Sequence, residues 1–70
     1  MNNIRAFREK NGLTHEELGD KLGISQVTIS QYESGARTPN LFMAKTIAEF
    51  FGISLEALFF DFNISKRNVN

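Results

Sequence analysis

The chain has 70 residues and a mass of 7.9 kDa, which is enough for one domain and too little for two. Eight basic and eight acidic residues cancel to a formal net charge of zero, which excludes a polybasic nucleic-acid tail and an acidic disordered segment. Without cysteine there are no disulfides or thiolate metal sites, and no apolar run has the length of a membrane span or of a secretory signal. We therefore expect a soluble, cytoplasmic chain with no membrane partner.

Helical spacing of apolar residues predicts the first two elements. The first helix is expected to run for about two turns and to end near Asn11–Gly12, where glycine can adopt the left-handed conformation. Thr14 followed three residues later by Glu17 is a capping box, in which each side chain bonds a backbone N–H of the other residue. It predicts the start of a second helix, which ends at Gly23.

A very short turn leads to the third helix. Ser25 is a favoured N-cap, and the helix is expected to run through about Glu33 and to end at Ser34–Gly35. Thr38 and Pro39 then read as the N-cap and the first residue of a fourth helix, since proline has no N–H to leave unpaired there.

The fourth helix carries an apolar stripe, and glycine at position 52 ends it. The stripe residues are Leu41, Ala44, Ile47, Ala48 and Phe51. Ser54 caps a short fifth helix. Residues 60–65 alternate apolar and polar side chains, which predicts a short strand, although Phe60 could instead continue the fifth helix.

Two short helices joined by a tight turn indicate a helix-turn-helix, a motif that many DNA-binding proteins use. Gly19 falls where a side chain on the second helix would collide with the third helix if the two cross steeply. The third helix also has an uncharged outer surface of glutamine, serine and threonine. These side chains offer paired donors and acceptors to base edges, although the same pattern could be a neutral solvated face.

Several ordered motifs together resemble the Cro/C1-type helix-turn-helix family, which has the lambda-repressor-like fold of phage repressors and small bacterial regulators. The resemblance covers residues 4–59. It rests on the segments 4–8, 11–19, 22–25, 29–35, 37–39, 47–48 and 52–59. It implies an all-α, compact five-helix domain at residues 1–59 with the helix-turn-helix at residues 14–34. Residues 60–70 would be a tail with a dimerisation strand and a loose end.

The resemblance also implies roles for individual residues. The base-reading positions would be Gln26, Val27, Thr28 and Gln31. The phosphate-contacting positions would be Thr14, His15, Ser25, Ser30, Arg37, Thr38 and Asn40. The family usually has glutamine at the position of His15, and Val27 could instead pack under the turn. Arg8 and Glu33 would form a structural ion pair between the first and third helices, the alternative being two separate surface charges.

The chain has seven phenylalanines, more than one small core obviously hides. Phe42 and Phe50 stand where the family more often has small or polar residues. One interpretation is a core arranged differently, with phenylalanine lying flat over the fifth helix. The other is a homodimer interface on the fifth helix and the tail, formed by Leu55, Phe59, Phe60, Phe62 and Ile64.

The function expected from these features is sequence-specific binding of double-stranded DNA. The chain would be a transcriptional regulator, a repressor in the first instance, binding a palindromic operator as a homodimer with its third helix in the major groove. The alternative is an antitoxin-like or protein-interaction module whose main partner is another protein. A single histidine without a nucleophile–base or ligand cluster predicts no enzyme activity, no metal and no cofactor, and no small-molecule site is evident.

Overall fold

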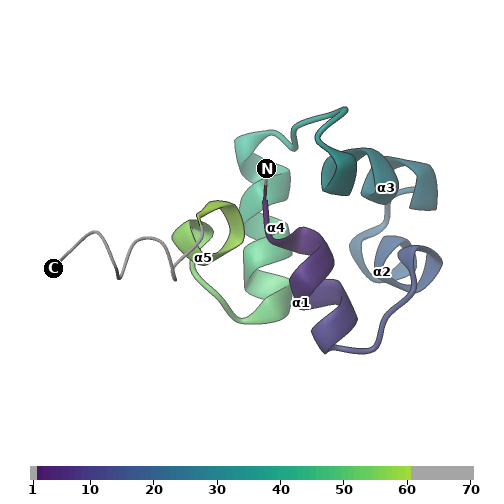
Figure 1. Cartoon of the computed structure of the whole chain (residues 1–70), viewed down its shortest axis with the longest axis horizontal. Coiled ribbons are helices and arrows are strands. Elements are labelled where there is room, and N and C mark those ends of the chain that lie inside the picture. Colours follow the sequence, from purple (N-terminus) through teal and green to yellow (C-terminus); the bar gives the residue numbers. More distant parts are fainter. Residues whose placement is uncertain (1, 61–70) are drawn as a thin grey trace, which may run out of the picture.

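The computed structural model describes residues 2–60, which form five α-helices (Figure 1). The helices are α1 (Ile4–Lys10), α2 (His15–Leu22), α3 (Gln26–Ser34), α4 (Leu41–Phe51) and α5 (Leu55–Phe59). The predicted all-α fold class is confirmed, and residues 2–60 contain no strand. The strand predicted for residues 60–65 lies outside the described residues except for Phe60, which follows α5 in an extended conformation.

Side-chain caps begin most of the helices where the sequence predicts. The Oγ1 of Thr14 accepts a hydrogen bond from the backbone N–H of Glu17 at 3.0 Å, and the Glu17 carboxylate accepts one from the N–H of Thr14 at 2.8 Å. The predicted capping box is therefore confirmed. Ser25 and Ser54 each accept from the backbone N–H three residues later, at 3.1 Å. Gly23 ends α2 with a φ of 74°, a left-handed conformation that suits glycine.

The start predicted for the fourth helix is wrong by two residues. Helix α4 begins at Leu41, and its N-cap is Asn40, whose side-chain oxygen accepts from the N–H of Met43 at 2.8 Å. Asparagine is among the best N-cap residues because its short side chain reaches back to that donor. Pro39 is buried ahead of the helix, and Thr38 lies exposed in the preceding loop.

Each helix contributes one fully buried side chain to a common core. These five side chains are Ile4, Leu18, Ile29, Ile47 and Leu58. Tyr32, Ala44 and Ala48 are also buried, and half-buried leucine, isoleucine, methionine and phenylalanine side chains pack around them. Because no helix pair encloses this core alone, the five helices depend on one another for their burial.

Leu41 does not belong to the buried stripe of α4. Its side chain is 68% exposed, whereas Ala44, Ile47 and Ala48 further along the helix are buried. Side chains of a helix tilt toward its N-terminus, so a residue in the first turn reaches past the end of the core. Phe42 is also exposed, which contradicts a rearranged core that hides it.

Two asparagines ahead of α1 hold distant parts of the chain together, a role the sequence pattern did not reveal. The side-chain amide of Asn3 donates to the carbonyl oxygens of Ala57 at 2.9 Å and Phe60 at 2.8 Å. The amide of Asn2 donates to the carbonyl oxygen of Tyr32 at 2.9 Å. The start of α1 is therefore tied to the ends of both α3 and α5.

Gly19 allows α2 and the start of α3 to approach closely. A β-carbon at this position would lie 2.5 Å from the carbonyl oxygen of Ile24 and 3.4 Å from the backbone nitrogen of Gln26. The obstructing atoms belong to the backbone of the turn, so they cannot swing aside as a flexible side chain could. This contact fixes how α3 leaves α2. None of the helices within residues 2–60 is long and apolar enough to cross a membrane.

We expect Gly19→Ala to destabilise the fold by about 1–3 kcal/mol, because the added methyl group forces the turn away from α2. An ordinary mid-helix glycine shows the opposite sign, since alanine there stabilises a helix by roughly 0.5–1 kcal/mol. Urea denaturation followed by circular dichroism measures the difference. Asp20→Ala at the neighbouring exposed position is the control. A Gly19→Ala variant as stable as the parent chain would contradict the close contact.

Candidate nucleic-acid interface

The first turns of α3 present an uncharged polar surface to solvent. Gln26 and Ser30 are exposed, and Val27 is 58% exposed, which contradicts its packing under the turn. Thr28 and Gln31 are half-buried. The outer side of α3 therefore combines amide, hydroxyl and methyl groups, and none of the five carries a charge.

The two half-buried residues, Thr28 and Gln31, each make a hydrogen-bonded contact with a neighbouring segment. The hydroxyl of Thr28 lies 2.9 Å from that of Ser25, and the Ser25 oxygen also accepts from the Thr28 N–H. Ser25 thus caps α3 and holds the Thr28 side chain. The backbone carbonyl of Gln31 accepts from the N–H of Arg37 at 3.2 Å, which brings the loop after α3 beside this residue.

The first residue of α2 joins the surface of α3. His15, Gln26, Val27 and Ser30 together line one shallow hollow. Residues predicted separately as a phosphate contact and as base readers are therefore neighbours. Because these residues come from both helices, a ligand in the hollow would meet α2 and α3 at once.

The remaining predicted phosphate contacts lie at the N-termini of three helices and in the loop between α3 and α4. Thr14, Ser25 and Asn40 are the N-caps of α2, α3 and α4, and each uses its side-chain oxygen to accept a backbone N–H. Arg37 and Thr38 are exposed in the loop between α3 and α4. Helix N-termini attract anions, because their unpaired N–H groups and the positive end of the helix dipole both point outward.

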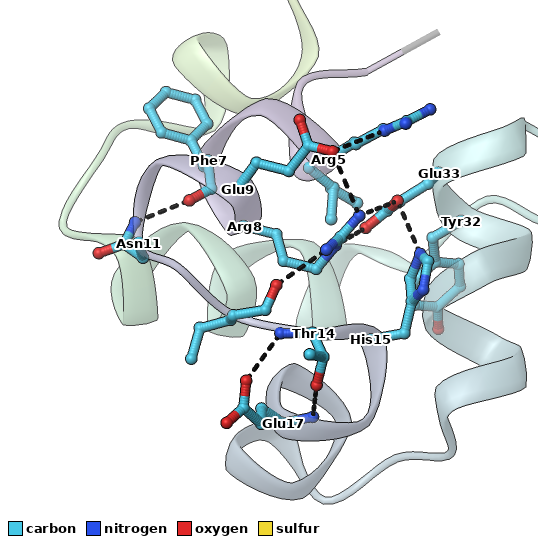
Figure 2. A network of polar contacts seen from close by, with 12 residues as sticks. Arg5, Phe7, Arg8, Glu9, Asn11, Thr14, His15, Glu17, Tyr32 and Glu33 are labelled. Carbon is cyan, nitrogen blue, oxygen red and sulfur yellow. Dashed lines mark hydrogen bonds and ion pairs between the residues drawn. The ribbon is translucent and has the colours of Figure 1, made fainter.

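A buried ion pair sets the position of α3 (Figure 2). Arg8 donates to the two carboxylate oxygens of Glu33 from Nε at 2.6 Å and from Nη2 at 3.1 Å. Its Nη1 donates to the carbonyl oxygen of Leu13 at 2.8 Å. The Arg8 and Glu33 side chains are only 9% and 6% exposed. They form the predicted pair and are not two separate surface charges.

His15 belongs to the same cluster, a contact that no spacing in the sequence indicated. Its Nε2 lies 3.1 Å from Oε1 of Glu33, while its side chain is 42% exposed. Figure 2 shows Arg8 and His15 approaching the Glu33 carboxylate from different helices. One carboxylate therefore connects α1, α2 and α3.

This cluster shifts the proton affinities of its members. Burial by itself raises the pKa of Glu33, but hydrogen bonds from Arg8 and His15, together with their charges, outweigh it and lower the pKa below its usual value of 4.5. The hydrogen bond to Glu33 raises the pKa of Arg8, although burial acts in the opposite direction. The charge of Arg8 is thus neutralised inside the protein and is unavailable to a phosphate.

The surface predicted for dimerisation is only partly described. Leu55 and Phe59 are half-buried and pack against the core, which leaves only part of each side chain for a partner. Phe60 is 58% exposed. Phe62 and Ile64 lie outside the described residues. Within residues 2–60 there is no cluster of three or more histidine or carboxylate side chains that could hold a metal ion.

The pKa of Glu33 is lower in the folded chain than in the unfolded chain, so the ionised carboxylate stabilises the fold at neutral pH. We expect this stabilisation to be lost as the pH falls below about 4.5 and the carboxylate becomes protonated. Glu33→Gln should destabilise the protein at pH 7 by about 3 kcal/mol, since it leaves a buried arginine without its counter-charge. This difference between the variant and the parent chain should shrink in acid.

Urea denaturation at a series of pH values measures both effects. Asp20→Asn removes an exposed carboxylate and serves as the control. An unchanged gap between Glu33→Gln and the parent chain from neutral to acidic pH would show that the ionised carboxylate does not stabilise the fold.

Comparison with known proteins places this geometry in a family. A helix-turn-helix family model matches residues 4–58. The chain is 41% identical over 58 residues to an HTH-type transcriptional regulator of Methanocaldococcus jannaschii, covering 83% of this chain and 88% of that protein. It is 45% identical over 56 residues to an HTH-type transcriptional regulator of Archaeoglobus fulgidus, covering 80% of each.

A third relative is the cryptic phage CTXphi transcriptional repressor RstR of Vibrio cholerae, 30% identical over 96% of this chain and 58% of its own length. Together with the five helices and the close α2–α3 turn, these matches identify the fold. The chain belongs to the Cro/C1-type helix-turn-helix family of transcriptional regulators.

Proposed function

We propose that this chain is a sequence-specific DNA-binding repressor that binds double-stranded, palindromic operator DNA as a homodimer in the cytoplasm. The observation that carries the proposal is the exposed, uncharged face of α3, on which Gln26, Val27 and Ser30 point away from the core. An α-helix fits the major groove, and amide side chains can pair with the donor and acceptor of an adenine edge. A purely structural surface helix would more often carry lysine and glutamate pairs.

We assign base-reading roles to the residues of α3 according to how far their side chains are exposed. Gln26 and Val27 reach the bases first, with Gln26 toward adenine and the Val27 methyl groups toward thymine. Gln31 and Thr28 contribute from the side of the helix. Because the Thr28 hydroxyl is held by Ser25, its part in base reading is smaller than that of Gln26.

Phosphates are proposed to bind at the ends of the α3 surface. On one side, His15 and the N-termini of α2 and α3 contact one strand. On the other side, Arg37, Thr38 and the N-terminus of α4 with Asn40 contact the opposite strand. Together with Ser30, these contacts fix the register of α3 on the duplex.

Repression by occupancy needs no chemistry and no cofactor, and we propose that the chain has neither enzyme activity nor a small-molecule ligand. The repressor RstR, which aligns with almost the whole chain, supports this direction of regulation. The HTH-type transcriptional activator BcrR of Enterococcus faecalis is 34% identical to the chain, but the alignment covers only 27% of BcrR. Two copies on a palindrome would place their α3 helices about 34 Å apart, one turn of the duplex.

A second candidate function is a protein-interaction module whose main partner is another protein. The observation in its favour is the set of large apolar side chains exposed on the described part of the chain. They are Leu41, Phe42, Phe50 and Phe60, besides Val27 on α3. Binding DNA does not by itself require them.

Selection of bound sequences from random duplex DNA tests the leading proposal. We expect an enriched palindrome with half-sites about one helical turn apart. Binding should weaken steeply with salt, with a log–log slope near −0.9 for each phosphate contacted. A parent chain that enriches no sequence would refute DNA reading and favour the protein-interaction module.

Two substitutions separate base reading from phosphate contact. Gln26→Ala should relax the preference at its base pair, at a cost of about 1–3 kcal/mol on the selected operator. Arg37→Ala is the matched control: it should weaken binding to all sequences alike and reduce the salt slope by about 1. Fluorescence anisotropy on the operator and on a scrambled duplex measures both. If Gln26→Ala keeps the parent preference, the residue does not read bases.

A further inference from the structure

The outer face of α4 is a solvent-facing surface whose side chains are not among the proposed DNA contacts. We define this face by Phe42, Lys45, Thr46, Glu49 and Phe50, which lie opposite the buried side of the helix. Phe42 is 76% exposed and Phe50 is 41% exposed. Two phenylalanine rings facing water on one helix are a feature of a contact surface rather than of a solvated one.

Its two charges are not paired with each other. Lys45 and Glu49 are four residues apart and exposed, yet no ion pair joins them among the interactions of residues 2–60. This order, with lysine nearer the N-terminus, is the less favourable one for an ion pair within a helix. Both charges therefore remain available to a partner.

The centre of the face is small and apolar. The hydroxyl of Thr46 donates back to the carbonyl oxygen of Phe42 at 2.9 Å, so its one donor is used inside the helix. The side chain is also small beside the two phenylalanines. A second helix could therefore approach closely at Thr46, between the two phenylalanines.

The spacing of these residues lets two copies of the helix complement each other when they run antiparallel. Phe42 and Phe50 lie four residues on either side of Thr46, and Lys45 and Glu49 lie on one side of the helix with opposite charges. Phe42 and Phe50 are centred on Thr46, whereas Lys45 and Glu49 are centred on Ile47. If two such helices pack antiparallel about a two-fold axis between Thr46 and Ile47, each Phe42 lies within one residue, about 1.5 Å along the helix, of the Phe50 of the second copy. Each Lys45 then meets the second copy's Glu49, as an isologous interface requires.

We propose that the outer face of α4 is the contact between two copies of this chain, packed antiparallel about a two-fold axis near Thr46. The proposal rests on the homodimer proposed above and moves the centre of its interface from the tail to α4. Another protein could satisfy the phenylalanines, but charge complementarity at both ends favours the chain itself.

The neighbouring surface fits this arrangement. A groove lined by Lys45, Ala48, Glu49, Ile53, Leu55 and Glu56 runs along α4 toward α5. The α4 face is thus continuous with Leu55, one of the residues predicted for the dimer. Figure 1 shows α4 between α5 on one side and the α2–α3 pair on the other.

Sedimentation equilibrium of the full chain without DNA tests the proposal. The parent chain should be dimeric, and Phe42→Asp should be monomeric while keeping the parent circular dichroism spectrum. The variants Lys45→Glu and Glu49→Lys should each have a dimer dissociation constant at least about tenfold higher than the parent chain. Each substitution creates two contacts between like charges, one at each symmetry-related pair of positions 45 and 49. Lys21→Glu, an exposed charge reversal on α2, is the control and should dimerise like the parent.

Mixing the two charge-reversed variants gives the sharpest result. In the mixed dimer every glutamate faces a lysine, so Lys45→Glu with Glu49→Lys should recover association to within about threefold of the parent chain. Neither helix propensity nor misfolding can produce this recovery, because each variant alone remains weak. The double variant Lys45→Glu/Glu49→Lys should dimerise by itself for the same reason.

Four results would overturn the proposal: a monomeric parent chain, a dimeric Phe42→Asp variant, no recovery on mixing, or a face covered only by a different protein. Phe62→Asp distinguishes the tail, since a monomeric Phe62→Asp beside a dimeric Phe42→Asp would place the interface there. The measurements contain no DNA. A chain that obeys the mixing rule but selects no sequence would therefore refute the proposed function and leave the α4 interface standing.

Discussion

The Glu33 carboxylate is the interaction on which the rest of this small structure depends. It accepts hydrogen bonds from Arg8 on α1 and contacts His15 at the start of α2, while its own helix carries the proposed base-reading residues. A buried charge pair contributes little net stability, because desolvation offsets much of the attraction. Its role here is geometric, because one carboxylate joins side chains of α1, α2 and α3 at a single point.

Gly19 supplies the second constraint, and it acts through sterics rather than charge. The ion pair holds the C-terminal end of α3, whereas the close approach at Gly19 holds its N-terminal end against α2. A helix fixed at both ends presents Gln26, Val27 and Ser30 in a constant orientation. Such preorganisation matters for reading DNA, because a misplaced amide cannot make both hydrogen bonds to a base edge.

The two surfaces of the chain differ in chemistry and in place. The face of α3 is polar and uncharged, which suits direct hydrogen bonding to bases, while the outer face of α4 pairs aromatic rings with opposite charges. The zero net charge is consistent with this division. Arg8 is neutralised inside the protein and does not add to the non-specific attraction to phosphate, whereas Arg37 is exposed and can. Discrimination by the proposed repressor would then depend on α3 more than on bulk electrostatics.

The sequence by itself determined the number of helices, most of their ends and the family, because caps such as Thr14–Glu17 and left-handed glycines such as Gly23 are local signals. The resemblance to the family also supplied the Arg8–Glu33 pair. The start of α4 at Asn40 rather than Thr38 is also set locally, by the hydrogen bond that Asn40 accepts from Met43. Only the tertiary structure decided that Leu41 and Phe42 face solvent and that His15 joins the Glu33 cluster. These two outcomes depend on which side chains of other helices fill the space nearby. Spacing along one helix describes its own faces but not what covers them.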